Sequence, residues 1–323
     1  MTAAEHEQHR LRVLISFALV YVLWGGTYLA MRVAVREIPP YVIGSVRYII
    51  SGLVMLAWCA LTGKKVRITR QDFVRLLTIG VLLLSLANIG VMWAEVYVPS
   101  GLTALIVAFV PIWVAVLEAW VFRVGGMPAR GAIGLGLGVA GIGVLLWPKI
   151  ASGTHLGRLE LFGAGILCLA SLSWALGSIL SHRWTLNVGV LSSVAWQMTL
   201  GGAVSTVVAL VSGQFPKAHW TAPGLWAVAF LVVCGSWIGF TCYIWLLEHV
   251  PPPKVATYAY ANPIVAVLLG WLLLNERIDV FMIVGTVVIV AAVALVSTAK
   301  LKRVSATGAT ESAELPAVNV AAD

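Results

Sequence analysis

Ten stretches of apolar residues, each about long enough to cross a lipid bilayer, constrain the fold of this chain more than any other feature. The stretches cover residues 12–35, 41–62, 74–96, 100–122, 131–148, 160–181, 188–212, 224–248, 254–274 and 279–298. A hydrocarbon core of about 30 Å is crossed by a helix of roughly 20 apolar residues. Because the backbone must satisfy its own hydrogen bonds inside lipid, helices are the expected structure. The sequence therefore predicts an all-α membrane protein with ten transmembrane helices.

The composition excludes most other classes of protein. Of the 323 residues, 60% are hydrophobic and 11% are charged, whereas ordinary globular domains carry about 25% charged residues. Soluble enzymes, disordered chains and nucleic-acid-binding domains are therefore not expected, and the lipid bilayer is the predicted environment. Four cysteines lie within apolar stretches, without a CxxC pair or a Cys/His cluster. We therefore expect neither structural zinc nor a disulfide framework. No metal site and no cofactor are expected.

The basic residues predict how the chain is oriented in the membrane. With the N-terminus in the cytoplasm, fourteen Lys and Arg residues fall in inner segments and seven in outer segments. Cytoplasmic loops of membrane proteins carry such an excess of basic residues. Both termini are therefore expected in the cytoplasm, with residues 1–11 as a polar tail and 299–323 as a disordered tail. The first stretch is interpreted as a retained helix, because it is too long for a signal peptide.

The two halves of the chain carry the same landmarks in the same order. The pairs lie 150 to 152 positions apart and are Trp24 with Trp174, Trp93 with Trp245, Pro111 with Pro263, and Gly134 with Gly285. They define a first repeat, 12–148, and a second repeat, 160–298, joined by a linker, 149–159. Because five spans are an odd number, the second repeat must enter the membrane from the opposite side. Secondary transporters use such inverted repeats, with the substrate site near the midplane between them.

Pro111 and Pro263 are expected near the middle of their spans. A proline inside a helix removes one backbone hydrogen bond and strains the preceding turn. In a membrane this is tolerated where neighbours or a water-filled cavity satisfy the freed carbonyl. Pro111 and Pro263 are therefore candidate hinges for alternating access, and a kink that serves packing alone is the other interpretation.

Aromatic and polar side chains at membrane depth are the candidate substrate contacts. Trp24 and Tyr28 share one face of the first span, and Trp174 and Ser178 share one face of the sixth. Aromatic faces suit apolar or aromatic groups, while amides and hydroxyls can bind the ends of a zwitterion. The alternative for the tryptophans is packing or the interfacial belt. The predicted substrate-binding residues are Trp24, Tyr28, Asn88, Trp174, Ser178, Tyr258 and Asn262.

Ionisable side chains are expected at span ends and not at mid-depth. Asp72 and the other two aspartates fall in loops or in the tail. Because proton-driven carriers normally use a buried carboxylate or histidine, facilitated diffusion is favoured over coupling through Glu95 or Glu118. Arg32 and Arg47 are expected to extend to the outer interface, and contact with a substrate carboxylate is the alternative.

The fifth span contains Gly136-Leu-Gly138-Val-Ala-Gly141, which matches the GxGxxG pattern of dinucleotide-binding proteins. That pattern requires a preceding strand and a following acidic residue, and neither is expected here. Gly134 and Gly143 continue the series. The glycines are better explained as a small-residue face along which another helix can approach closely.

Three segments resemble the EamA family of the drug/metabolite transporter superfamily. They are Leu-Trp-Gly-Gly-Thr-Tyr-Leu-Ala-Met-Arg (23–32), Ala261-Asn262-Pro263 and Leu274-Asn275-Glu276-Arg277. The similarity covers about residues 12–298, but the first half has Val124 at the position that corresponds to Glu276. Within the family the chain looks most like the YddG-type exporters of aromatic and other amino acids. The resemblance implies a central cavity between spans one to four and six to nine, with spans five and ten at the periphery.

These observations predict a multi-pass inner-membrane transporter that exports amino acids, aromatic and other neutral ones, and related small metabolites. It would work by alternating access as a facilitator, and a single chain would suffice. Two alternatives from the same superfamily are an exporter of drugs or lipophilic compounds and a proton-coupled metabolite antiporter. No enzymatic activity is expected, because no HExxH motif, carboxylate pair or nucleophile–base arrangement is present. A scaffold or receptor would need larger soluble loops.

Overall fold

The computed structural model describes residues 3–123, 129–152 and 155–298. All regular secondary structure in these residues is helical, which confirms the all-α prediction for the described part of the chain. Eight helical runs within it are long and apolar enough to cross a membrane. Two shorter apolar helices, Asn262–Leu274 and Val280–Ala292, lie in the expected ninth and tenth spans. The total of ten crossings stays a prediction, and Val124 and the expected tail 299–323 lie outside the described residues.

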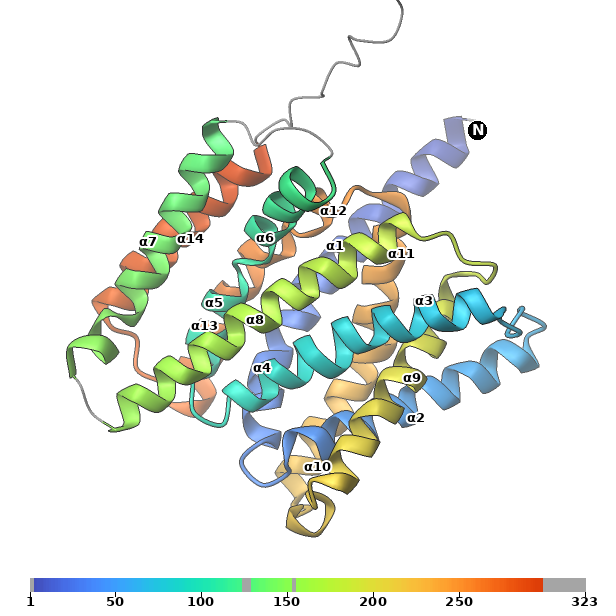
Figure 1. The fold of residues 1–323 in the computed structure, drawn as a ribbon, viewed down its shortest axis with the longest axis horizontal. Helices are drawn as coiled ribbons and strands as arrows, with labels where there is room; N and C mark the ends of the chain where they lie inside the picture. Colours follow the sequence, from blue (N-terminus) through green and yellow to red (C-terminus); the bar gives the residue numbers. More distant parts are fainter. Residues whose placement is uncertain (1–2, 124–128, 153–154, 299–323) are drawn as a thin grey trace, which may run out of the picture.

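Each half of the chain forms a similar series of helices (Figure 1). The first half contains α1 (Ala3–Ala34), α2 (Pro40–Leu61), α3 (Arg70–Gly80), the π-helical segment η1 (Val81–Asn88), α4 (Ile89–Ala94), α5 (Ser100–Val107), α6 (Val110–Val116), the π-helical segment η2 (Leu117–Val121) and α7 (Ala129–Ser152). The second half contains α8 (His155–Arg183), α9 (Val190–Val211), the 3₁₀ turn η3 (Phe215–Lys217), α10 (Ala222–Phe230), the π-helical segment η4 (Leu231–Phe240), α11 (Thr241–His249), α12 (Pro252–Val255), α13 (Tyr258–Leu274) and α14 (Val280–Thr298).

Local sequence determines where α3 begins. The Thr69 hydroxyl accepts a hydrogen bond from the Asp72 N–H (3.1 Å), and the Asp72 carboxylate accepts one from the Thr69 N–H (3.2 Å). This capping box satisfies backbone donors that the first helical turn leaves free. Asp72 is therefore buried in the first turn of α3. Its expected position in a loop is wrong, because the apolar pattern starts one turn after the helix does.

Several expected boundaries differ from the structure. Residues 3–11, expected as a tail, form the first turns of α1, and the expected linker is helical up to Ser152 and again from His155. The fourth span, Ser100–Val121, is one helical run interrupted at residues 108–109, where α5 ends at Val107 and α6 begins at Val110. Pro111 therefore lies in the first turn of α6, where its missing N–H costs no hydrogen bond. Pro263 lies inside α13, as expected. The role of both prolines as hinges stays a prediction.

Corresponding helices of the two halves pack against each other in opposite directions. The Ser45 hydroxyl on α2 is 2.6 Å from the Thr206 hydroxyl on α9. Two turns further along α2, Gly52 faces Thr199, which lies two turns earlier on α9. The second helix of each half is therefore antiparallel to its counterpart, which is the arrangement that an inverted repeat produces. The fifth helices, α7 and α14, also lie side by side, at one edge of the molecule (Figure 1).

The glycines of α7 allow close approach at two of the expected positions. A methyl group on Gly138 would come within 2.5 Å of the Ile112 side chain, and one on Gly141 within 2.8 Å of Ile289. The small-residue face is therefore confirmed at these two glycines. Gly136 and Gly143 face open space instead, so their lack of a side chain is not required by a neighbouring helix.

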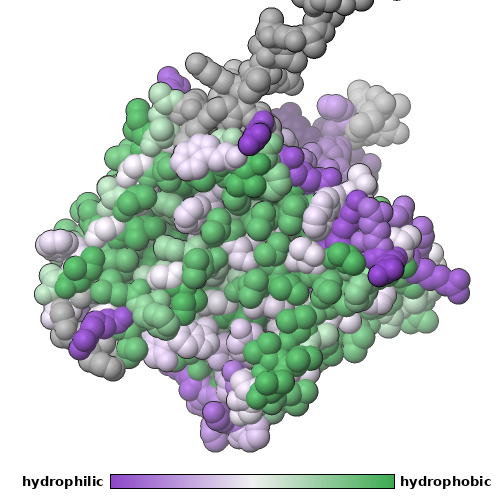
Figure 2. Space-filling model, viewed as in Figure 1, coloured by the Kyte–Doolittle hydropathy of each residue, from purple (hydrophilic) through white to green (hydrophobic). Residues whose placement is uncertain are grey.

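The outer surface of the bundle is apolar. Figure 2 shows hydrophobic residues over the middle of the visible face, with hydrophilic residues gathered toward its edges. Large exposed hydrophobic side chains include Trp58, Leu169 and Trp226. A soluble protein rarely exposes so large a continuous apolar area, so this surface is suited to lipid.

Candidate functional site

A cavity of about 50 Å³ lies between the two halves and is lined by residues from both. The lining comes from α1, α2, η1, α4, α5, α8, η4 and α13. Its aromatic members are Trp24, Tyr28, Tyr48, Trp174, Phe240 and Tyr258, and its polar side chains are Thr27, Arg47, Asn88, Ser171, Ser236 and Asn262. α9, which forms the seventh predicted span, contributes no lining residue.

Most of the predicted substrate-binding residues come together at this cavity. Those that line it are Trp24, Tyr28, Asn88, Trp174, Tyr258 and Asn262. Ser178 does not line it. Its hydroxyl donates to the Trp174 carbonyl (2.6 Å) and is 2.5 Å from the Tyr243 hydroxyl. Ser178 therefore supports residues around the cavity and does not face the space itself. The part each residue plays in binding stays a prediction.

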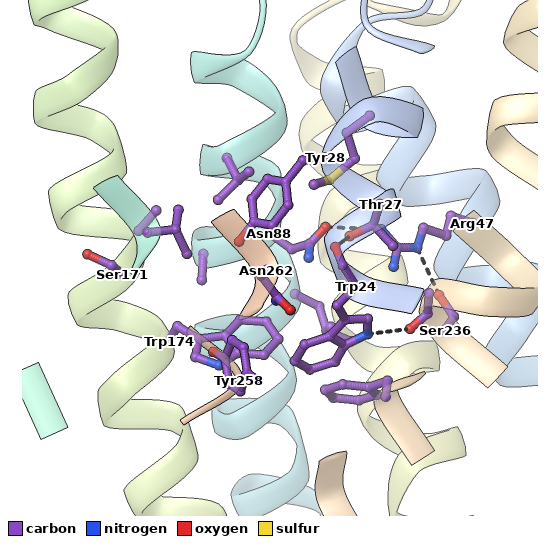
Figure 3. A pocket seen from close by; sticks show the side chains of 18 of the residues that line it. Trp24, Thr27, Tyr28, Arg47, Asn88, Ser171, Trp174, Ser236, Tyr258 and Asn262 are labelled. Atoms are coloured by element: carbon purple, nitrogen blue, oxygen red, sulfur yellow. Dashed lines mark hydrogen bonds between the residues drawn. The ribbon is translucent and has the colours of Figure 1, made fainter. Parts of the chain in front are cut away.

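An aromatic cluster lies at one end of the cavity, and Tyr28 lies at the other (Figure 3). The Trp24 ring meets the Trp174 ring at 5.4 Å and 83°, and the Tyr258 ring at 5.3 Å and 89°. These edge-to-face contacts are favoured by the charge distribution of aromatic rings. The indole N–H groups are also satisfied: Trp24 donates to the Gly235 carbonyl (3.1 Å), and Trp174 donates to the Tyr243 hydroxyl (2.9 Å). The cluster is therefore held by both packing and hydrogen bonds.

Arg47 is the charged residue of the lining, and it is buried with 4% of its surface exposed. Its Nε donates to the Ser236 hydroxyl (2.8 Å), and Nη1 donates to the Asn88 amide oxygen (3.1 Å). The guanidinium also lies 4.8 Å from the centre of the Tyr48 ring. The expectation that Arg47 extends to the outer interface is therefore wrong. The apolar pattern of α2 does not show that the face carrying Arg47 turns into the bundle.

The positive charge of Arg47 has only neutral partners in the described part of the chain. Ser236 and Asn88 are uncharged, and no described carboxylate pairs with the guanidinium. Buried charges in proteins are normally paired, because removing an ion from water is costly. Gly235 provides room for the guanidinium, since a methyl group there would come within 2.7 Å of Nη2. The site is therefore able to receive an anionic group.

Two π-helical segments shape the polar side of the cavity. η1 brings Asn88 to the lining and η4 brings Ser236, and the two segments begin 150 positions apart, at Val81 and Leu231. π-helical turns are uncommon and frequently occur at functional sites. For Arg47, contact with a substrate was only the alternative interpretation of the sequence, and Ser236 was not among the predicted contacts. A hydroxyl in the middle of an apolar eighth span was the available signal for Ser236.

Other polar groups lie in the lining or on the segments next to it. In the amide orientation that satisfies its surroundings, Asn262 donates to the carbonyls of Tyr21 (3.1 Å) and Tyr258 (3.3 Å). One turn beyond Tyr28 along α1, Arg32 donates to the Glu95 backbone carbonyl. The Glu95 carboxylate oxygens are both buried and make no hydrogen bond within the described residues.

Two inverted halves of apolar helices around a central polar cavity are the architecture of a secondary transporter. Comparison with protein families agrees with this class. Residues 11–147 and 161–298 each match the EamA-like transporter family. The chain therefore belongs to the EamA-like transporter family, as the three sequence segments predicted.

Similar proteins carry transporter names without a stated substrate. An uncharacterized inner membrane transporter of Escherichia coli (strain K12), YedA, is 36% identical over 287 residues, which cover 88% of this chain and 90% of YedA. An uncharacterized transporter of Bacillus subtilis (strain 168), YoaV, is 24% identical over 279 residues, covering 86% and 94%. A crystal structure superposes with a TM-score of 0.65 at 20% identity, covering 88% and 95% of the two chains. This last likeness concerns the fold alone.

Proposed function

We propose that this protein is an inner-membrane exporter of amino acids, aromatic and other neutral ones, that works by alternating access as a facilitator. The observation that carries the proposal is the buried Arg47, which faces the cavity without a carboxylate partner among the described residues. The carboxylate of a free amino acid would supply that partner through charge-assisted hydrogen bonds. The inner-membrane location follows from the similarity to YedA, an inner membrane transporter of E. coli.

The rest of the lining suits the other end of such a substrate. Trp24, Trp174 and Tyr258 present aromatic surface at one end of the cavity. An apolar or aromatic side chain would be removed from water there and would meet ring faces and edges. A lipophilic cation, the substrate of the multidrug alternative, would lie beside the Arg47 charge and be repelled by it. The lining therefore favours amino acids over cationic drugs.

The size of the cavity indicates a closed conformation. Its volume of about 50 Å³ is well below the roughly 300–1,000 Å³ of small-molecule sites. An amino acid can enter only if helices of the two halves move apart. In the proposal the described conformation is the closed state between the inward-open and outward-open states. One chain, with ten spans and both termini in the cytoplasm, carries out the cycle. Nothing in this cycle requires enzymatic chemistry.

The test is exchange of radiolabelled phenylalanine across proteoliposomes that contain the purified protein. Arg47→Gln keeps a hydrogen-bonding side chain but removes the charge, and we expect at least about a tenfold loss of exchange. A tenfold loss corresponds to about 1.4 kcal/mol, which is close to the smallest net contribution of a hydrogen bond to a charged group. Phenethylamine, which lacks the carboxylate, should compete weakly. Arg36→Gln, at an exposed arginine in the α1–α2 loop, is the matched control. Unchanged exchange in Arg47→Gln would refute the proposal.

Proton-coupled antiport is the second candidate, and Glu95 is the observation that favours it. Its buried carboxylate without a hydrogen-bond partner is costly in the charged form. A group in this position is suited to carry a proton across a closed state. Coupling predicts that a pH gradient drives net phenylalanine flux and that Glu95→Gln abolishes this drive. A facilitator shows the same net flux with and without the gradient.

A further inference from the structure

The carboxylate of Glu276 connects the second half of the protein to a helix of the first half. Glu276 follows α13, and its oxygens accept hydrogen bonds from the backbone N–H groups of Ser100 (2.9 Å) and Gly101 (3.2 Å). The Ser100 hydroxyl adds contacts of 3.0 and 2.9 Å to the two oxygens. These N–H groups form the N-terminus of α5, where the helix dipole also favours a negative charge.

Three features of the second half place the Glu276 carboxylate against α5. Asn275 ends α13 in the left-handed conformation, with φ of 54°, which turns the chain back over the helix. The Glu276 N–H then donates to the Gly270 carbonyl (3.1 Å). A methyl group on Gly270 would come within 2.4 Å of the Glu276 carboxylate and 2.9 Å of the Ser100 hydroxyl. The side chain of any other residue at 270 would therefore occupy the place of this contact.

The contact and the cavity lie at opposite ends of α5. α5 runs from Ser100 at the contact to Val107, which lines the cavity, and its eight residues span about 12 Å. Between these points α5 packs closely on α13, since a methyl group on Gly101 would touch Val267 at 3.0 Å. The loop after α4 and the loop after α13 both lie at this end. The distribution of basic residues predicts that these two loops are outside the cell.

The opposite end of the molecule has neither part of this contact in its sequence. At the offset of 152 positions, Ser100 and Gly101 correspond to Pro252 and Pro253, which have no backbone N–H to donate. The residue that corresponds to Glu276 is Val124, which has no carboxylate. The equivalent positions at the opposite end therefore have neither the carboxylate nor the backbone N–H groups that would bind it. The contact is therefore one of the features in which the two halves differ.

We propose that Glu276 is a positioning residue that latches the outer end of the transport route by holding the N-terminus of α5. Release of the carboxylate lets α5 and α13 separate and opens the cavity to the outside, while the inner end opens without such a bond. This inference rests on the proposed transport function and deepens it. A one-sided outer latch suits an exporter, because the resting protein stays closed to the exterior and loads its substrate from the cytoplasm.

The test measures from which side the cavity is accessible. Val91 lines the cavity, and Val91→Cys serves as the reporter for a membrane-impermeant maleimide, with the labelling of the parent protein subtracted. With Glu276→Ala added, we expect labelling from outside to rise about tenfold or more, with no rise in inside-out vesicles. Glu276→Gln keeps one acceptor oxygen, so its outside labelling should lie between that of the reporter protein and that of Glu276→Ala. Ser100→Pro should also raise outside labelling, because it removes a donor at a helix position that tolerates proline.

Asp279→Ala is the matched control. Its carboxylate caps α14 within the same half by accepting from the Met282 N–H (2.7 Å), so this change removes a cap without removing the connection between the halves. Labelling of Asp279→Ala should equal that of the reporter protein. The proposal is overturned if Glu276→Ala leaves outside labelling unchanged, raises it equally from both sides, or raises it only from inside. Labelling needs no substrate. A failure of amino-acid exchange would therefore contradict the proposed substrate without contradicting the proposed role of Glu276.

Discussion

Trp174 shows how single side chains around the cavity are held in place. Its indole N–H donates to the Tyr243 hydroxyl, and its ring makes an edge-to-face contact with the Trp24 ring. Ser178 hydrogen-bonds the same Tyr243 hydroxyl. Helical spacing correctly placed Trp174 and Ser178 on one face of a helix. That spacing does not distinguish a residue that lines a cavity from one that supports the lining, because the difference depends on what α11 places opposite.

At this scale we predict the effect of removing one aromatic ring. Trp174→Ala should lower phenylalanine exchange about tenfold or more while leaving the amount of protein in the membrane unchanged, because the ring supplies surface for the substrate and packs on Trp24. Trp226→Ala removes the same side chain from a position that is 78% exposed, and exchange should stay at the parent level. Equal exchange by the two variants would remove Trp174 from the candidate site.

At the scale of helices, the apolar stretches predicted most of the elements within a few residues. Pro111 predicted an irregularity in the fourth span, and the break between α5 and α6 lies just before it, but nothing predicted the π-helical segments η1 and η4. Such irregularities depend on how each helix packs on its neighbours. The amino-acid composition of a span therefore does not reveal them. The close approach of α7 to its neighbours was predictable from Gly138 and Gly141, since glycines at this spacing share a helix face.

We predict different effects for two neighbouring glycines of α7. Gly138→Leu should reduce the free energy of unfolding by about 1–3 kcal/mol or more, because the side chain would overlap Ile112. Gly136→Leu, on the open side of the same helix, should cost little. Thermal unfolding of both variants in the same detergent measures the difference. A Gly136→Leu variant that is as unstable as Gly138→Leu would contradict this packing arrangement.

At the scale of the whole molecule, the inverted halves place equivalent loops at opposite ends. The His219 N–H donates to the Glu37 carbonyl (3.0 Å), so the loop after α9 meets the loop after α1. Because α2 and α9 are antiparallel, the loop that follows α2 lies at the other end. The odd number of spans in each repeat predicted this arrangement, but which loops touch is known only from the packed structure.

Labelling of exposed loop residues tests this arrangement. Lys217→Cys and Arg36→Cys should react with an impermeant thiol reagent from the same side of the membrane, and Lys64→Cys from the opposite side. The positive-inside orientation further predicts that the first two react from outside the cell. Reaction of Lys64→Cys and Lys217→Cys from one side would contradict the inverted repeat, because the two residues occupy equivalent loops.

The sequence by itself determined the membrane class, the pairing of the halves, the family and most of the cavity's aromatic residues. These follow from apolar length, spacing and motifs, which are properties of the chain taken in order. Tertiary structure alone decided that Arg47 is buried and that Glu276 reaches α5. Each of these depends on residues far apart in the chain, Ser236 for Arg47 and Ser100 for Glu276. A charged side chain has no preferred partner until packing removes it from water and leaves specific donors and acceptors within reach.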